Sequence, residues 1–174
     1  MTISTITNCQ FLYEKINKTD NLIVTGSFQT LEGFPETFDG NIRVISSELS
    51  SLYGGPKTVS GLFNIGAGIL TSLKFAPTTM NQLMCSFCCY LTDISDIFEK
   101  EILNKSTQIC IDFNKSLASL PLLKLKNHII SLEPVFEDII YAHEDNTSKK
   151  NIISCQIELI KNGFEKNARW KPCE

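Results

Sequence analysis

A strong net charge is missing from this chain of 174 residues. The net charge is −3, so the sequence carries neither the basic footprint of a nucleic-acid-binding protein nor the strongly acidic surface of a DNA mimic. Hydrophobic residues make up 43% of the chain and charged residues 20%, a balance that allows a packed core. We therefore expect a single domain over residues 1–174 that has no nucleic-acid partner.

Long apolar runs are missing as well. No stretch is long enough to span a bilayer, so we expect no membrane association. Residues 1–9 are polar and lack the basic start and apolar block of a secretory signal. Most of the 7 cysteines lie in apolar surroundings, as Cys110 does between Ile109 and Ile111, where a reduced thiol packs as a small core residue. These features predict a protein of a reducing cytoplasm.

Residues that could support catalysis are scarce. The only two histidines, His128 and His143, do not lie in a motif with a serine or cysteine nucleophile. Residues 54–58 superficially resemble a phosphate-binding loop, but they contain a proline and lack the required glycine–lysine spacing. Cys85 and Cys88 form a C-x-x-C pair without the second pair that a metal site needs. We expect no enzyme activity, no catalytic residues, no cofactor and no metal site.

What the sequence does contain is a repeat with a period of 21 residues. A leucine or isoleucine, a proline and a threonine each recur at this spacing (Leu31, Leu52, Leu73 and Ile94; Pro35, Pro56 and Pro77; Thr37, Thr58 and Thr79). A short leucine-led block precedes each of the later leucines (Leu49–Ser51, Leu70–Ser72 and Leu91–Asp93). A half-repeat that begins at Leu22 and is one residue short in its middle comes before them.

Each unit predicts a short strand, a turn and a return segment. Apolar and polar residues alternate over 41–44 and 62–65, which is typical of a strand with one buried face. A coil of this kind cannot bury its own apolar face, so stacked coils should share one core and form a parallel ladder, with strands near Ile42, Phe63 and Met84. The leucines should then be buried, and the prolines suit turns on the return side. An array of β-hairpins with accidental spacing is the alternative.

The third unit departs from the pattern. Gln82 stands 21 residues after Gly61, and Phe75 takes the place that Gly33 and Gly54 hold in the earlier units. Between residues 92 and 119 the period fails, which indicates an inserted element that breaks the array.

The repeat resembles that of leucine-rich-repeat-like proteins of tailed bacteriophages, whose blocks have the form L-T-S-L-x-G-x-P-x-x-V-x-G. Leu70–Leu73 and Leu52–Phe63 match this pattern, and residues 154–170 look like the ending of many such proteins. The resemblance covers residues 22–97 well and 120–170 loosely. It implies a phage origin, and thus the host cytoplasm, an α/β solenoid of leucine-rich-repeat-like coils, and a strand whose cysteine faces the core near Cys85. It implies no activity.

The rest of the chain predicts elements at the two ends. We expect an N-terminal cap over residues 1–21, repeat coils over 22–93, a helical insertion and last coil over 94–132, and a C-terminal helical cap over 133–174. Within these, we expect helices over 94–103, 133–141 and 151–162 and a strand over 107–113. On the last helix, one side collects most of the apolar residues (Ile152, Ile153, Ile157 and Ile160, with Gln156), and Gly163 should end it.

The outward positions of the strands are the best candidate binding site. If Ile42 and Phe63 face the core, Arg43 and Asn64 face outward on neighbouring strands, with Asn41 and Leu62 beside them. Repeat solenoids commonly bind partners through such a surface, although a solvated sheet face is the alternative. The leading hypothesis is a binding module for a host or phage protein, such as a host defence protein. The alternatives are a virion structural or assembly component and an enzyme with an unrecognised site near one of the histidines.

Overall fold

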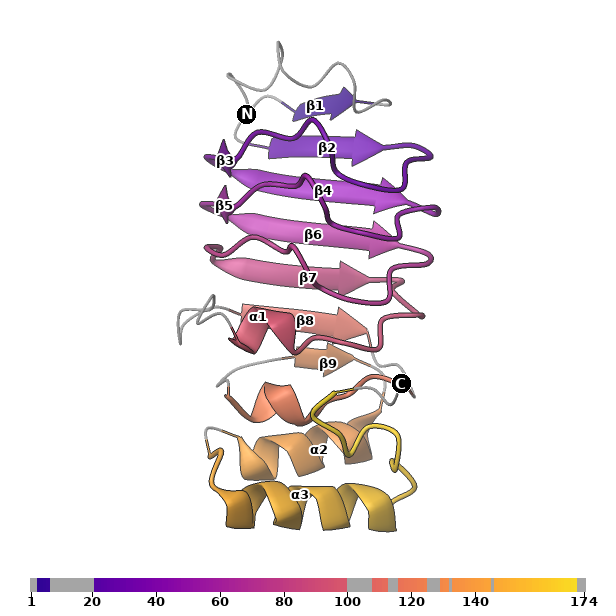
Figure 1. The fold of residues 1–174 in the computed structure, drawn as a ribbon, viewed down its shortest axis with the longest axis vertical. Helices are drawn as coiled ribbons and strands as arrows, with labels where there is room; N and C mark the ends of the chain where they lie inside the picture. The colour runs from indigo at the N-terminus through magenta and orange to yellow at the C-terminus, as the bar shows by residue number, and fades with distance from the viewer. Residues whose placement is uncertain are drawn as a thin grey trace.

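The computed structural model is a stack of coils whose strands form one parallel sheet (Figure 1). It describes residues 3–6, 21–99, 108–112, 116–124, 129–131, 133–144 and 146–171. The strands stack in chain order: β1 (Ile3–Ile6), β2 (Asn21–Thr25), β4 (Asn41–Ser46), β6 (Leu62–Ala67), β7 (Gln82–Ser86), β8 (Gln108–Asp112) and β9 (Ile129–Ser131). Every pairing between neighbours is parallel, so the chain is a β-solenoid and the hairpin alternative is wrong.

The return side of the coils forms a second, smaller ladder. The strand β3 (Thr37–Phe38) pairs in parallel with β5 (Thr58–Val59), and Thr79 extends this ladder through a bridge to Thr58. The recurring threonines therefore mark the return strand of each coil. The prolines lie just before these strands, and Pro56 and Pro77 are buried.

The core lies between the two ladders. Alternate residues of β4 and β6 point into it, and Ile42, Val44, Phe63 and Ile65 are fully buried. The recurring leucines are also part of this core, as predicted, and each is 0–1% exposed (Leu31, Leu49, Leu52, Leu70, Leu73 and Leu91). The 21-residue spacing thus places like side chains above one another in continuous apolar columns.

Side-chain hydrogen bonds explain why the leucine-led blocks recur. The Thr92 hydroxyl donates to the carbonyl of Thr71, one coil earlier, at 3.2 Å. The next residue of the block precedes a turn: the Ser72 hydroxyl accepts the amide of Lys74, where the turn begins, at 3.0 Å. The same two bonds recur in neighbouring coils (Ser50 Oγ to Gln29 O; Tyr53 N to Ser51 Oγ; Ser95 N to Asp93 Oδ1). The second residue of each block thus bonds to the preceding coil, and the third residue bonds to the turn that follows it.

The third coil keeps the 21-residue period except in its strand, whose register is shifted by one residue. The expected strand near Met84 is present as β7, but Leu83, which lies 20 residues after Phe63, pairs with Phe63 and points into the core. The glycine position is occupied by Asn81, whose amide donates to Gly61 O, and not by Gln82. The spacing between equivalent residues returns to 21 in the connection after β7. This connection contains Phe87, an exposed residue with a φ of 58°.

The ladder continues beyond the point where the sequence period fails. The strand β8 pairs in parallel with β7, so the expectation that an inserted element breaks the array is wrong. The helix α1 (Asp96–Glu99) lies in the longer connection between them. It begins two residues later than expected, because Ile94 is buried and continues the leucine column. Residues 100–107, and with them the expected end of this helix, lie outside the described residues.

The stack ends in helical layers (Figure 1). After the 3₁₀ helix η3 (Leu120–Lys124) and β9, the helix α2 (Pro134–His143) contacts both of them and also contacts α3 (Lys149–Lys161). The Ser148 hydroxyl accepts the Asn151 amide at the start of α3, and Gly163, with a φ of 84°, follows its end as expected.

The side of α3 where the sequence gathers most isoleucines is not the side that packs most closely against the stack. Cys155 and Leu159 are the buried residues of this helix, whereas Ile153, Ile157 and Ile160 are exposed. The helix lies in the last layer, where only one side can pack against the stack. Its buried side is set by contact with α2 and by the returning tail, since Gln156 donates to the carbonyl of Ala168.

Candidate binding surface on the strand ladder

The outer face of the sheet carries parallel rows of side chains. Because the strands pair in register, Ile23, Arg43 and Asn64 are direct neighbours across β2, β4 and β6. Asn41 and Leu62 begin the adjacent row on β4 and β6. Neighbouring strands lie about 4.8 Å apart, so residues of one row can contact one ligand. The structure therefore brings together all four residues that the sequence predicted for this site.

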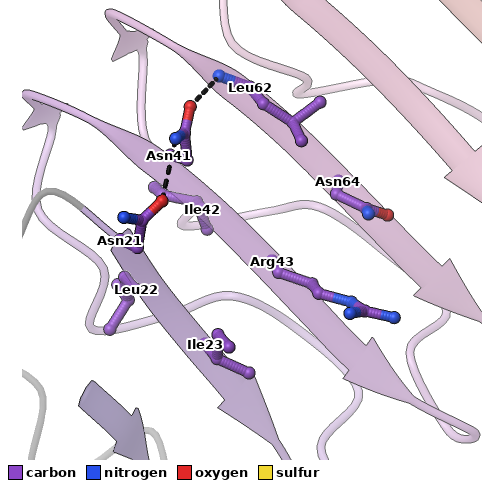
Figure 2. A pocket seen from close by; sticks show the side chains of 8 residues that line it. All are labelled: Asn21, Leu22, Ile23, Asn41, Ile42, Arg43, Leu62 and Asn64. Atoms are coloured by element: carbon purple, nitrogen blue, oxygen red, sulfur yellow. Dashed lines mark hydrogen bonds between the residues drawn. The ribbon is translucent and has the colours of Figure 1, made fainter. Parts of the chain in front are cut away.

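A shallow hollow of about 280 Å³ lies over these rows (Figure 2). Its lining comes from the first residues of three successive strands (Asn21, Leu22, Ile23, Asn41, Ile42, Arg43, Leu62 and Asn64). Sequence reasoning missed Asn21 and Ile23, although the half-repeat at Leu22 already held the signal. Once Leu22 is assigned to the core, alternation places both of its neighbours on the outer face.

Asparagine side chains form a short ladder at one end of the hollow (Figure 2). Asn41 donates from Nδ2 to Asn21 Oδ1 at 2.8 Å and accepts the Leu62 amide on its own Oδ1 at 2.7 Å. A glycine precedes Leu62 because a Cβ at Gly61 would meet the Asn41 amide oxygen and lie 2.8 Å from Gly40 O. Asn41 is thus held in place by two bonds, which fixes the shape of this end of the hollow.

Arg43 supplies the positive charge of the hollow. Its side chain is exposed, and no carboxylate in the described part of the chain forms an ion pair with it. Asn64 lies beside it and donates to Met84 Sδ at 3.4 Å, a weak bond that leaves its amide oxygen available. Apolar neighbours complete the surface, with Ile45 39% exposed. A guanidinium flanked by amides and apolar side chains can bind a carboxylate together with an apolar group.

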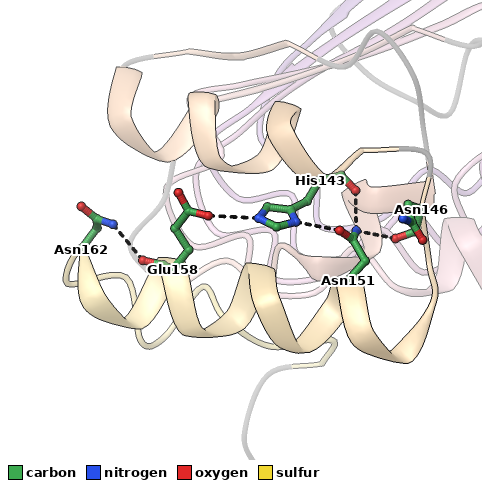
Figure 3. Close-up of polar contacts among 5 residues, drawn as sticks. All are labelled: His143, Asn146, Asn151, Glu158 and Asn162. Carbon is green, nitrogen blue, oxygen red and sulfur yellow. Dashed lines mark hydrogen bonds and ion pairs between the residues drawn. The ribbon is translucent and has the colours of Figure 1, made fainter.

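His143 lies in a different polar cluster, between α2 and α3 (Figure 3). Its Nδ1 is 2.8 Å from Asn151 Oδ1, and its Nε2 is 3.0 Å from Glu158 Oε2. The side-chain nitrogen Nδ2 of Asn151 donates to the backbone carbonyls of His143 and Asn146. Both ring nitrogens are therefore engaged in joining the two helices. His128, the other histidine, lies outside the described residues.

The C-x-x-C cysteines belong to the core. Cys85 and Cys88 are each 1% exposed, and both are free thiols. The hydrogen bond with Cys88, together with burial, raises the pKa of Cys85, while the same hydrogen bond lowers the pKa of Cys88. In the described residues, no group of three or more histidine, cysteine or acidic side chains could hold a metal ion. The structure thus presents this pair as packed thiols that contact each other.

Among the helices of the described residues, none combines the length and the apolar character needed to cross a membrane.

No family model matches the chain, and neither a curated protein nor a solved structure matches it.

Proposed function

We propose that this protein is a binding module that recognises another protein through the outer face of its strand ladder. The observation that carries the proposal is the hollow in which Arg43, without an ion pair to any described carboxylate, lies among amide and apolar side chains. Arginine is enriched at interface hot spots because its planar group donates several hydrogen bonds while its stem packs against apolar groups. Because a sheet face is already ordered, little conformational entropy is lost on binding.

The resemblance of the repeat supports a more specific role. We propose that the coils are of the leucine-rich-repeat-like type found in tailed phages. The protein would then act in the host cytoplasm on a host or phage protein, with host defence proteins as the leading class. The helices α2 and α3 would serve as a cap, which is supported by the edge-to-face contact of Phe136 with Phe164 at 5.3 Å. In this proposal the protein is not an enzyme.

The test is Arg43→Ala in affinity capture from infected cells. A specific partner recovered with the wild-type chain should bind the variant at least about tenfold more weakly. The unfolding temperature should stay unchanged, because the Arg43 side chain is exposed and forms no ion pair with the described carboxylates. Lys74→Ala is the matched control, since it removes an exposed cation outside the hollow, and Ile42→Ala should destabilise the fold.

Two outcomes would redirect the proposal. Equal binding by wild type and Arg43→Ala, with loss of binding in α3 variants, would move the functional surface to the C-terminal helices. Recovery of the protein in purified virions by mass spectrometry would favour the structural or assembly role. The enzyme alternative loses support at His143, whose ring nitrogens are both engaged.

A further inference from the structure

The outward side of α3 is an apolar stripe at the end of the stack. Ile153, Ile157 and Ile160 are 43%, 48% and 50% exposed, and their spacing aligns them along one side of the helix. Cys155 and Leu159 occupy the opposite, buried side. Figure 1 shows α3 beyond α2, at the end of the stack that lies farthest from β1. The last layer thus has an apolar surface on both of its sides, and only one of them is covered.

Lysines border this isoleucine stripe on both sides. At about 100° per residue, Lys149, Lys150 and Lys161 lie within about 75° of the centre of the stripe. All three are exposed, and no ion pair within the described residues involves them. The only acidic residue of α3, Glu158, lies on another side of the helix and pairs with His143. The charged residues nearest the stripe are therefore lysines, and Glu158 lies beyond Lys161, at the far edge of a hollow that both residues share with Ile157.

The charges on the borders decide which occupant fits. A second copy of the chain would bring lysines on one α3 against lysines on the other, which is unfavourable. A membrane surface is usually bound through a larger apolar face that includes aromatic anchors, and the stripe has only three isoleucines. A helix with its own apolar stripe and acidic borders matches both features, since it buries the isoleucines and pairs with the lysines.

We propose that α3 docks an acidic amphipathic helix of a protein partner. The partner helix lies along Ile153, Ile157 and Ile160, and its carboxylates pair with the bordering lysines. This surface is separate from the hollow at Arg43, so the two sites can be tested independently.

The first experiment uses a fluorescent designed peptide in which a leucine stripe is flanked by glutamates. A twin peptide with lysines in place of the glutamates is the matched probe. The full chain should bind the acidic peptide and not its twin, and Ile157→Ser should weaken binding about tenfold or more. Serine and isoleucine have similar helix propensities, so α3 should stay formed. Ile69→Ser, which changes an isoleucine 45% exposed on a coil turn, should have no effect.

The second experiment reverses the charge of the borders. Lys150→Glu combined with Lys161→Glu should abolish binding of the acidic peptide and create binding of the lysine twin, with an unchanged unfolding temperature. Arg43→Ala should leave peptide binding intact, which separates this site from the ladder. Failure of the acidic peptide to bind would overturn the proposal. So would binding to phosphatidylserine vesicles in its place, or a dimer in sedimentation that Ile157→Ser disperses.

Discussion

Single residues at the turns decide how closely the coils can stack. Gly33 and Gly54, 21 residues apart, have φ values of 97° and 77°, in the left-handed region. Phe75 holds the same place in the third coil with a φ of 69°, although this conformation is costly for a side chain with a Cβ. Its ring is exposed and meets Tyr53 edge to face at 5.5 Å. That contact offsets part of the conformational cost.

Two glycines with similar φ values allow the effect of close stacking to be measured. Gly163→Ala should cost about 1 kcal/mol, because φ is 84° but nothing lies within 4 Å of the new Cβ. Gly54→Ala, at a φ of 77°, should cost about 1–3 kcal/mol more, because its Cβ would lie 2.6 Å from Glu32 Cα in the coil before. Urea denaturation of both variants checks this. Equal losses would show that the coils can separate at this turn without cost.

At the scale of elements, α3 shows how one helix can have two apolar sides. Its isoleucines form the wider apolar side in the sequence, yet Cys155 and Leu159 make the contact with the stack. The polar cluster of His143, Asn151 and Glu158 joins α3 to α2 along a third side. Together with the contact of the returning tail, this cluster fixes the rotation of the helix and leaves Ile153, Ile157 and Ile160 exposed.

Burial of Cys155 in α3 predicts a loss of stability at alkaline pH. Burial, with a smaller effect of the Glu158 charge, raises the pKa of Cys155 to about 12. The thiol of the unfolded chain loses its proton near its ordinary pKa of about 9, whereas the folded state keeps it. The free energy of unfolding should therefore fall as pH rises from about 9 to about 12. Urea denaturation across this range, under reducing conditions, should show a smaller fall for Cys155→Ala. Identical slopes for the two proteins would contradict it.

At the scale of the whole molecule, the coils make a quasi-one-dimensional stack. Each strand of the large sheet pairs only with its neighbours in that sheet, from β1 to β9. The apolar columns run along the same direction, so each coil is stabilised chiefly by the coils on either side. The destabilisation caused by a local loss of packing should therefore be greatest near the substituted residue and decrease along the stack.

Leu52→Ala tests this view of the stack. The side chain is fully buried in the leucine column, so the substitution should lower the free energy of unfolding by about 2–5 kcal/mol. Under native conditions, amide hydrogen exchange should rise most in β4 and β6 and least in α3. Ile69→Ala is the control, because Ile69 lies on a coil turn and is 45% exposed. A uniform rise of exchange along the chain would mean that the stack opens as one unit.

The sequence by itself determined the coil and its repetition. Leu31, Leu52 and Leu73 at one spacing, with hydroxyl residues and turns at matching positions, are local signals that each coil repeats. Stacking is the way such units bury their apolar faces, so the parallel ladder and the outward position of Arg43 followed directly.

Only the tertiary structure decided which surfaces remain free. The slip that turns Leu83 inward, the continuation of the ladder through β8, and the side that α3 buries all depend on competition among neighbouring layers. Periodicity shows that Ile157 lies on an apolar side, but not whether a neighbour covers that side. A helix in the last layer has one neighbouring layer, and the contacts with that layer decide which of its two apolar sides stays in solvent.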